Sequence, residues 1–319
     1  MSRVNGWLVT RAYFAGWRVV RLLPERAAYR AFQSIADRSW RRRGESVRRL
    51  ERNLARVRPS AGEAELRELS KAAMRSYLRY YCDTFRLPGW SRERLVGTVR
   101  TVGDAPVRDL LARGESVVMF LGHMGNWDHA GAWSTVELAQ VTTVAEQLEP
   151  QAVFTAFLGF REGLGMRIVP LAGGDVFRTL LVALREPGTF MPLLADRDLS
   201  HNGVDVTFFG ESARMAAGPA ALALATGAAL FPVSIHYDEL GRGRHGIVIT
   251  WHDQVAVPEG RRGAQVAAMT QACADALAGA IAEHPQDWHM LQRVFAADFE
   301  AAGAGDRDDR GQVGARTPT

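Results

Sequence analysis

The segment SVVMFLGHMGNWD, residues 116–128, places a histidine and a carboxylate directly after an apolar run. The continuous apolar residues followed by glycine predict a buried strand that ends in a loose turn. His123 and Asp128 then lie just beyond the carboxyl end of that strand. In open α/β sheets this end of the strands is where ligands bind and chemistry takes place. The segment therefore predicts both a fold class and the position of a candidate active site.

These residue types suit general-base catalysis of acyl transfer to an alcohol. The neutral imidazole of His123 would take the hydroxyl proton near pH 7 as the oxygen attacks the acyl carbon. A carboxylate such as Asp128 would hold one imidazole tautomer and stabilise the imidazolium that forms. Backbone N–H groups of Gly125 and Asn126 would face the developing oxyanion. The alternative is structural, with His123 ending the strand and Asp128 opening the next helix.

The rest of the chain alternates between strand and helix patterns, which predicts an α/β fold with a mixed, largely parallel sheet sandwiched by helices. Strands are expected over 98–102, 116–121, 141–145, 167–170, 189–194, 205–208, 229–236 and 246–252. Helices are expected between them over 127–138, 149–164, 175–186, 217–226 and 264–283. Earlier helical patterns over 7–38, 44–58 and 63–86 predict an N-terminal helical extension. We therefore divide the chain into a helical region 1–95, an α/β core 96–301 and a disordered tail 302–319.

The charge of the chain is concentrated at its N-terminal end. Residues 1–100 carry 23 basic and 9 acidic side chains, whereas the remainder carries an excess of acids. The apolar helix expected at Trp7–Leu23 contains three arginines, which makes it interfacial rather than membrane-spanning. More arginines extend the basic surface at positions 41, 42, 43, 48, 49 and 52. The alternative is an amphipathic helix packed on the domain with a solvated face.

The same features predict a location at the cytoplasmic face of the cell membrane, as a peripheral protein. The arginines interrupt any secretory signal, and no small-residue cleavage site follows them. The two cysteines, Cys82 and Cys273, do not indicate a disulfide framework and are expected to be buried apolar residues. No zinc-finger spacing or other nucleic-acid reader is found in the sequence, so a nucleic-acid partner is not expected.

Two blocks of sequence resemble known acyltransferases. The spacing of His123 and Asp128 after an apolar strand is similar to the signature of glycerolipid and lipid A acyltransferases. The second block, LLADRDL at 193–199, also follows an apolar strand. It is followed by GVDVTFFG at 203–210 and by the Met-x-x-Gly-Pro segment Met215–Pro219.

Over most of its length, from about Trp17 to Asp298, the chain resembles the phosphatidylinositol mannoside acyltransferases. The resemblance is carried by NLARV at 53–57, FRLP at 85–88, TTVAE at 142–146, FREGLG at 160–165 and HPQDWHMLQ at 284–292. It implies a glycerolipid acyltransferase-like fold. It also implies transfer of a palmitoyl-like chain from acyl-CoA, as co-substrate, to a mannose hydroxyl of phosphatidylinositol mannoside or a similar anionic glycolipid.

The resemblance also assigns roles to residues. It makes His123 the general base and Asp196 the acid that completes its relay, at a position where the family usually has glutamate. Because aspartate is shorter, either the backbone brings Asp196 closer or Asp128 does more of the orienting. Glu146 and Arg161 match polar positions of the same pocket. Arg161 either bridges to Asp128 or meets a phosphate or thioester oxygen.

The remaining assignments concern residues expected to lie beside the substrate. Gly125 would let the thioester approach closely, and Asn126 and Arg197 are expected beside the substrate, with Arg197 paired to Asp198. The amphipathic segment Pro150–Leu164 either lines an acyl groove or packs on the sheet. Its apolar residues are Val153, Phe154, Phe157, Leu158 and Phe160.

Three functions remain open on this basis. The first is the phosphatidylinositol mannoside acyltransferase, and the second is a lipid A type or other lysolipid acyltransferase. The third is a non-catalytic membrane-binding relative. A serine nucleophile is not expected because no Gly-x-Ser-x-Gly elbow is present, and no metal is expected because the histidines lack ligand spacing. We expect direct attack by the acceptor hydroxyl and no cofactor.

Overall fold

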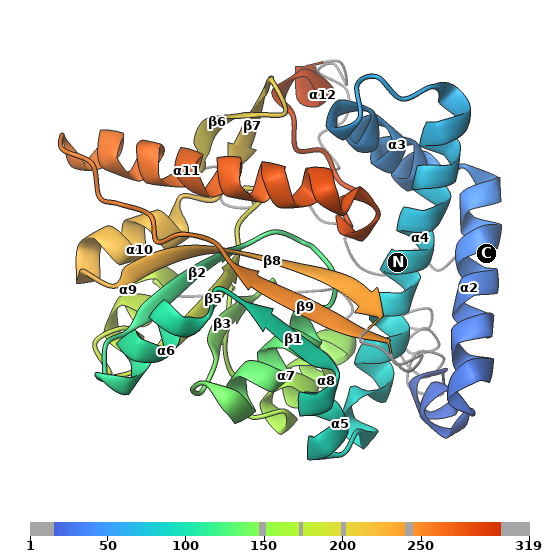
Figure 1. The fold of residues 1–319 in the computed structure, drawn as a ribbon, viewed down its shortest axis with the longest axis horizontal. Coiled ribbons are helices and arrows are strands. Elements are labelled where there is room, and N and C mark those ends of the chain that lie inside the picture. The colour runs from blue at the N-terminus through green and yellow to red at the C-terminus, as the bar shows by residue number, and fades with distance from the viewer. Residues whose placement is uncertain (1–15, 147–150, 172–174, 199–201, 240–244, 301–319) are drawn as a thin grey trace.

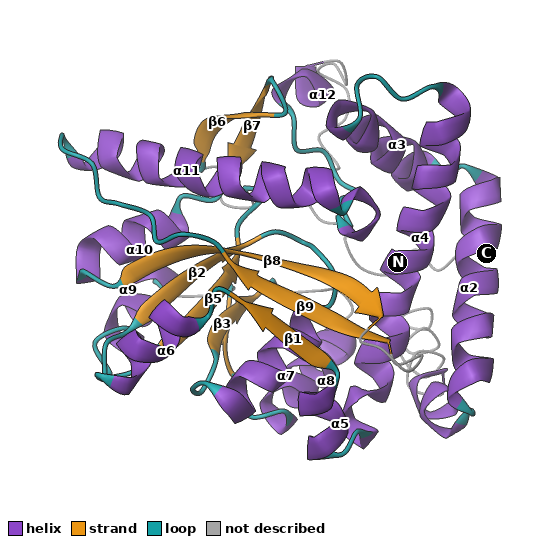
Figure 2. Cartoon of the chain, viewed as in Figure 1, coloured by secondary structure: helices purple, strands orange, loops and turns teal. Residues whose placement is uncertain are grey.

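The computed structural model describes residues 16–146, 151–171, 175–198, 202–239 and 245–300. A central sheet lies between helices, and an N-terminal group of helices stands at one end of it (Figures 1 and 2). This group comprises α2 (Glu25–Arg42), α3 (Glu45–Val57) and α4 (Glu63–Arg86). The predicted α/β class with a helical N-terminal extension is therefore confirmed.

The sheet is mixed and mostly parallel, as predicted. Its strand order is β1-β9-β8-β2-β5, with β8 and β9 antiparallel and the other neighbours parallel. The parallel pair β3 and β4 joins β5 through a bridge between Val141 and Phe190. The strands of these sheets are β1 (Val99–Val102), β2 (Val117–Leu121), β3 (Thr142–Ala145), β4 (Arg167–Pro170), β5 (Phe190–Leu194), β8 (Ala229–Glu239) and β9 (His245–Trp251).

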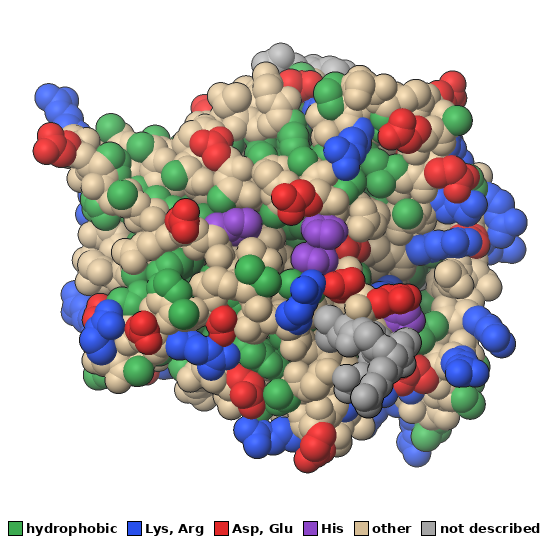
Figure 3. Space-filling model, in the orientation of Figure 1, with side chains coloured by type: hydrophobic (Ala, Val, Ile, Leu, Met, Phe, Trp, Pro, Cys, Tyr) green, Lys and Arg blue, Asp and Glu red, His purple; other side chains and the backbone are tan. Residues whose placement is uncertain are grey.

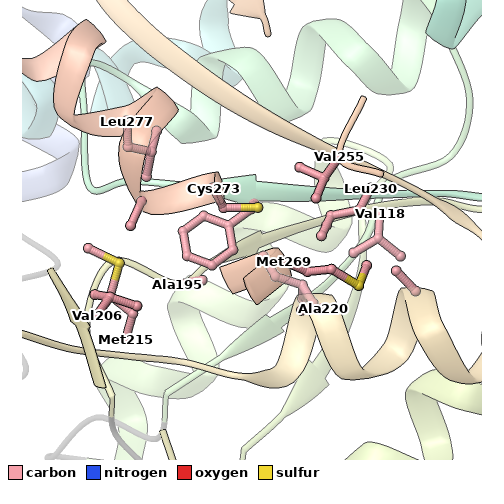
Figure 4. Close-up of a cluster of buried hydrophobic side chains, with 14 of the residues drawn as sticks. Val118, Ala195, Val206, Met215, Ala220, Leu230, Val255, Met269, Cys273 and Leu277 are labelled. Atoms are coloured by element: carbon pink, nitrogen blue, oxygen red, sulfur yellow. The ribbon is translucent and has the colours of Figure 1, made fainter. Parts of the chain in front are cut away.

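Helices cover both faces of this sheet, and every residue of β2 is buried, as expected for a strand inside an α/β sandwich. Val118 and Phe120 face a core shared with α9, α10 and α11, part of which is shown in Figure 4. Val117 and Met119 face a second core shared with α6, α7 and α8. The core helices are α5 (Arg92–Gly97), α6 (Ala105–Ala112), α7 (Trp127–Glu137), α8 (Gln151–Gly163), α9 (Val176–Ala183), α10 (Gly218–Thr226), α11 (Arg262–Glu283) and α12 (Ala296–Glu300), with short 3-10 turns η1 (Leu87–Gly89) and η2 (Pro285–Asp287).

The two cysteines are buried free thiols, as expected. Cys273 lies on α11 in the core of Figure 4, among Leu277, Met269 and Val118. Burial in this apolar surrounding raises the pKa of the Cys273 thiol. It therefore acts as a small apolar side chain.

The long helix expected over 7–38 is interrupted. Residues 16–22 are helical, the chain then turns at Leu23, and α2 begins at Glu25. Pro24, which precedes α2, has no N–H to donate, and its ring clashes with a preceding helical turn. The proline therefore divides the predicted helix in two. The start of that helix, residues 7–15, and the tail 302–319 lie outside the described residues.

The prediction missed the strand β7 and three short helices, α5, α6 and α12. β6 (Val204–Phe208) and β7 (Glu211–Met215) form an antiparallel hairpin in which Phe208 pairs with Glu211. Phe209 and Gly210 make the turn, with φ of 50° and 80°. Positive φ at both central residues is typical of the tight turns that match strand twist. The sequence pattern lacked the usual Asn-Gly or Asp-Gly signal for such a turn.

The basic residues predicted on the N-terminal helices are mostly at the surface, and Lys and Arg side chains gather along the edge where α2 runs (Figure 3). Several of them have acidic partners. Arg43 pairs with Glu51, and Arg48, Arg49 and Arg52 surround Glu45. The surface is therefore less positive than the arginine count alone suggests. Among the helices described, none is both long enough and apolar enough to cross a bilayer.

Candidate active site

The two residues expected to form the catalytic pair meet because their strands are neighbours in register. β2 and β5 run parallel, and Leu121 pairs with Leu194. His123 and Asp196 each lie two residues beyond these partners, so both chains deliver a side chain to the same edge of the sheet. This is the carboxyl edge that the sequence predicted as the location of the site.

His123 and Asp196 form a close hydrogen-bonded pair. The imidazole Nδ1 lies 2.5 Å from Oδ1 of Asp196, and the backbone N–H of His123 donates to Oδ2 at 2.9 Å. Asp196 is fully buried, whereas the side chain of His123 keeps 19% of its surface exposed. Since a carboxylate only accepts, Nδ1 carries a proton, and in the neutral imidazole Nε2 then carries the lone pair. The histidine is thus held in the tautomer that a general base requires.

The environment keeps Asp196 ionised. Burial by itself raises the pKa of this carboxyl, but the adjacent His123 and the hydrogen bonds from His123 and Trp288 outweigh it and hold the pKa below its usual value. An ionised carboxylate beside an imidazole can stabilise a positive charge that develops when the ring accepts a proton. Asp196 is therefore suited to stabilise the imidazolium formed during proton transfer.

Asp128 has other partners. Its Oδ1 accepts from Arg161 Nε at 2.7 Å, and its Oδ2 accepts from the Tyr80 hydroxyl at 2.7 Å. Asp128 is buried, and no hydrogen bond to His123 is present among the described contacts. The open question of which aspartate orients His123 is thus answered in favour of Asp196. The shorter side chain of aspartate, compared with glutamate, is sufficient because the strand register brings it near.

Arg161 takes the first of its two predicted arrangements, the bridge to Asp128. Burial alone lowers the pKa of its guanidinium, but Asp128 and Tyr80 outweigh this and raise it. Burial also raises the pKa of Tyr80 well above its usual value, and the charge of Asp128 adds to the effect. The cluster therefore consists of the neutral phenol of Tyr80, from helix α4, beside the buried ion pair of Asp128 and Arg161.

Two further polar residues predicted for the pocket, Glu146 and Arg197, contact each other. Arg197 donates to Glu146 at 2.9 Å, so these two predicted substrate residues do come together. The expected pairing of Arg197 with Asp198 is wrong. Asp198 accepts from the backbone N–H of Gly203 at 2.9 Å and lies 3.4 Å from Arg214.

The predictions for Gly125 and Asn126 need correction. Gly125 has φ of 56° and its N–H donates to the Asp287 carbonyl at 2.9 Å, so that N–H is not free for an oxyanion. A Cβ at Gly125 would lie 2.7 Å from the Ile235 carbonyl oxygen, so glycine is required for packing on β8. Asn126 is fully buried, and its Oδ1 caps α7 by accepting from the N–H of His129. The Gly125 N–H and the Asn126 side chain thus serve the turn itself, whereas the role expected for the Asn126 N–H stays a prediction.

A narrow apolar cavity of about 70 Å³, which is partly open to solvent, lies on the sheet face covered by α7. Its polar wall is Asp128 and Arg161, beside Trp127. The ring of Trp127 meets that of His123 edge-on, with centroids 5.6 Å apart. From there the lining follows the strands back to Phe190 and Val141. Since Phe190 lies four residues before Leu194, the lining extends roughly 13 Å along β5.

The cavity is not lined by the residues predicted for an acyl groove. Of the segment 150–164, Arg161 borders it, whereas the apolar residues pack elsewhere. Val153, Phe154 and Phe160 are buried. Phe157 and Phe160 contact Trp17, with ring centroids 5.8 and 5.6 Å away. The sheet and α7 supply the apolar surface instead, and helix packing accounts for these phenylalanines.

A segment to which no role was assigned also contacts the site. In HPQDWHMLQ, Trp288 Nε1 donates to Asp196 Oδ2 at 3.0 Å, and the N–H of His289 donates to the His123 carbonyl at 2.8 Å. The sequence contains this motif, but it lies so far along the chain from His123 that no local pattern predicts contact between the two. Within the described residues, no group of three or more His, Cys, Asp or Glu is arranged to hold a metal ion.

Comparison with known proteins identifies relatives over most of the chain. The sequence profile of the bacterial lipid A biosynthesis acyltransferases matches residues 2–297. A phosphatidylinositol mannoside acyltransferase of Mycolicibacterium smegmatis is 39% identical over 300 residues, which cover 93% of this chain and 94% of the relative. Proteins of the same name from two strains of Mycobacterium tuberculosis are 42% identical over 292 residues, covering 90% of this chain and 89% of each relative.

Proposed function

Because the chain belongs to the bacterial lipid A biosynthesis acyltransferase family, we propose that it transfers a long acyl chain from acyl-CoA to a mannose hydroxyl of phosphatidylinositol mannoside. The observation that carries the proposal is the His123–Asp196 pair beside an elongated apolar cavity. The names of the relatives supply the acceptor, since they are phosphatidylinositol mannoside acyltransferases. The geometry supports general-base catalysis of this transfer by His123.

In the proposed reaction, Nε2 of His123 accepts the proton of the mannose hydroxyl while its oxygen attacks the thioester carbonyl carbon. The tetrahedral intermediate collapses, the carbon–sulfur bond breaks and the CoA thiolate leaves. The imidazolium returns its proton to this thiolate, so that ester and free CoA are formed with the base regenerated. Asp196 stabilises the imidazolium between these steps without taking the proton itself.

The apolar lining of the cavity supports an acyl donor. The lining is almost entirely apolar and runs back beneath the sheet from the edge that holds His123. Each buried methylene of an acyl chain contributes about 0.8 kcal/mol, so an elongated apolar space favours long chains over short ones. Asp128 and Arg161 border the cavity at its polar wall, where the thioester and the carbohydrate would lie.

We further propose that the enzyme works at the cytoplasmic face of the membrane as a peripheral protein. Arg41, Arg42, Arg43, Arg48 and Arg52 are exposed on or next to α2 and α3. Each arginine near an anionic leaflet contributes about 1 kcal/mol at most, and pairing with Glu45 and Glu51 reduces this. An anionic glycolipid acceptor would be presented at the same surface.

The test is an acyl transfer assay on purified protein with palmitoyl-CoA, analysed by mass spectrometry. Phosphatidylinositol mannoside is compared with phosphatidylinositol, which lacks mannose but has the same anionic phosphate and tails. We expect an added acyl group only on the mannosylated lipid. Lysophospholipid and a lipid A precursor serve as rival acceptors. Transfer to either of these, and not to the mannoside, would establish the second function, and no transfer at all would favour a non-catalytic relative.

A further inference from the structure

The segment Asp287–His289 lies alongside the turn that carries His123 and is held to it by backbone hydrogen bonds. Met124 and Trp288 form an antiparallel bridge. The N–H of Gly125 donates to the Asp287 carbonyl at 2.9 Å, and the N–H of His289 donates to the His123 carbonyl at 2.8 Å. The turn is therefore paired on its outer side over three successive residues.

The same segment is anchored to the N-terminal helices. Ser76 of α4 donates to Asp287 Oδ1 at 2.5 Å, and its hydroxyl also lies 2.9 Å from His289 Nε2. The second carboxylate oxygen of Asp287 accepts from the backbone N–H of Tyr237 at 2.9 Å. With these contacts the backbone around Trp288 has little freedom to move.

The indole of Trp288 reaches the catalytic carboxylate from this fixed backbone. Its Nε1 donates to Oδ2 of Asp196 at 3.0 Å, and both side chains are fully buried. The ring is packed edge-on against Phe208, with centroids 5.8 Å apart, and touches Phe209. Oδ2 thus receives two neutral N–H donors, from Trp288 and from the His123 backbone. Oδ1 is the oxygen that remains for the imidazole.

We propose that Trp288 is a positioning residue, which orients the Asp196 carboxylate so that Oδ1 faces Nδ1 of His123 throughout the reaction. The inference rests on the proposed function of His123 as the base. A carboxylate held by one donor on Oδ2 has more freedom to rotate about its Cβ–Cγ bond than one held by two. Loss of the indole donor would thus make the orientation of the His123 imidazole less well defined. It would also leave the buried Oδ2 of Asp196 with one hydrogen bond fewer.

Two changes at this position separate the hydrogen bond from the ring. Trp288→Phe removes the donor and part of the ring, whereas replacement by 3-benzothienylalanine exchanges the N–H for sulfur and keeps the bicyclic shape. We expect kcat to fall about tenfold or more in both, with the KM for acyl-CoA within about twofold of wild type. We also expect the acidic limb of the kcat profile to move to higher pH, because a less solvated carboxylate favours the protonated imidazole.

The matched control is Trp90→Phe. The Trp90 indole N–H is also buried but has no hydrogen-bond partner among the described residues, and its ring meets His129 edge-on at 5.0 Å. This change should leave kcat and the pH profile at their wild-type values. Thermal unfolding of each variant shows whether it is folded at the assay temperature. Wild-type kcat and an unmoved acidic limb in the folded benzothienylalanine protein would overturn the inference.

A readout without turnover distinguishes this failure from failure of the proposed function. The proton on Nδ1 of His123, shared with Asp196, should give a far-downfield ¹H NMR resonance that is absent in His123→Ala. The benzothienylalanine replacement should shift or broaden this resonance, and Trp90→Phe should not. An unchanged resonance would contradict the positioning role even if no acceptor lipid were turned over. A changed resonance without any acyl transfer would contradict only the proposed reaction.

Discussion

Tyr80 of helix α4 donates a hydrogen bond to Asp128 in the first turn of α7, across 2.7 Å. This contact joins the N-terminal helices to the α/β core beside the candidate active site. The ring of Tyr80 also stacks on Trp127, with centroids 4.1 Å apart. Asp128 therefore serves to connect α4, α7 and, through Arg161, helix α8. A residue expected to orient His123 is instead bound to side chains of two other helices.

Asp128 and Asp196 should consequently respond differently to the same substitution. Asp128→Asn leaves the guanidinium of Arg161 buried without its charge partner, which typically costs about 3 kcal/mol or more of unfolding free energy. Asp196→Asn offers an amide to Nδ1 of His123 and favours the wrong imidazole tautomer, so turnover should fall by orders of magnitude. Urea unfolding and acyl transfer, measured on both variants, test the contrast. Equal losses of activity without any loss of stability in Asp128→Asn would contradict it.

Replacing the proposed base should lower turnover by orders of magnitude and preserve the fold. His123→Ala removes the group proposed to take the hydroxyl proton, and a general base typically contributes about 10² to 10⁴-fold to the rate. The side chain of His123 is partly exposed, so its loss should change the unfolding midpoint little. Transfer is followed by mass spectrometry, with circular dichroism to verify folding. Near-normal transfer by this variant would show that His123 is not the base.

Stability should fall as the pH is lowered through the weakly acidic range. Burial lowers the pKa of His289 to about 3 and of His129 to about 4, against an ordinary value of about 6.5 in the unfolded chain. Between these values only the unfolded state binds the proton, so each such histidine removes about 1.4 kcal/mol of stability per pH unit. The window runs from about pH 6.5 down to about pH 4.

His289→Gln tests this window directly. Denaturant unfolding at several pH values should give a flatter decline for this variant than for wild type, because one of the histidines with a lowered pKa no longer titrates. The slope is compared, since the substitution also changes the stability at neutral pH. His245→Gln, at a histidine whose side chain is 52% exposed, serves as the control with an unchanged slope. Parallel curves for all three proteins would refute the assignment.

The far end of the cavity should limit the length of the acyl donor. Val141 is buried and lines the cavity beside Phe190. Val141→Phe would fill this end, so that each methylene no longer accommodated forfeits about 0.8 kcal/mol of binding. We expect kcat/KM to fall for palmitoyl-CoA and to stay close to wild type for octanoyl-CoA. The ratio within one variant corrects for general losses of activity, and an unchanged ratio would place the acyl chain elsewhere.

The basic surface should be needed for binding to anionic vesicles. Replacing Arg41, Arg42, Arg43, Arg48 and Arg49 by glutamine should weaken co-sedimentation with phosphatidylinositol-containing liposomes, most strongly at low salt. The control removes the same number of exposed arginines from the core, at positions 113, 178, 185, 261 and 262. If both variants sediment equally well with the vesicles, the N-terminal surface is not the site of attachment.

Much of the α/β core was predictable because its signals are local. The strands β2 and β5 are apolar runs that end in glycine or in charged residues, and the observed bounds lie within one or two residues of those expected. Pro24 was visible in the sequence as a helix breaker but lay inside a helical pattern that extended on both sides. The hairpin of β6 and β7 was missed because Phe209 adopts positive φ, which a phenylalanine does not signal.

The site was predictable only in part, since hydrogen-bond partners depend on which elements become neighbours. His123 and Asp196 were both identified, but the acceptors of Arg161 and Arg197 were left open or assigned wrongly. The sequence predicts that Gly125 faces the substrate, because it does not reveal that Ile235 packs against this glycine. Trp288 received no role, since a buried tryptophan is usually a core residue.

The sequence by itself determined the alternation of strands and helices, the family, and the histidine at the end of β2, because apolar periodicity and motif spacing are properties of neighbouring residues. The tertiary structure alone decided that Asp196, and not Asp128, faces that histidine. This choice follows from the parallel register of β2 and β5, in which Leu121 lies opposite Leu194. It also depends on Tyr80 of α4, which donates to Asp128, and on Trp288, which lies near the end of the chain and donates to Asp196. Such long-range pairings are set by the packing of whole elements, which no local pattern encodes.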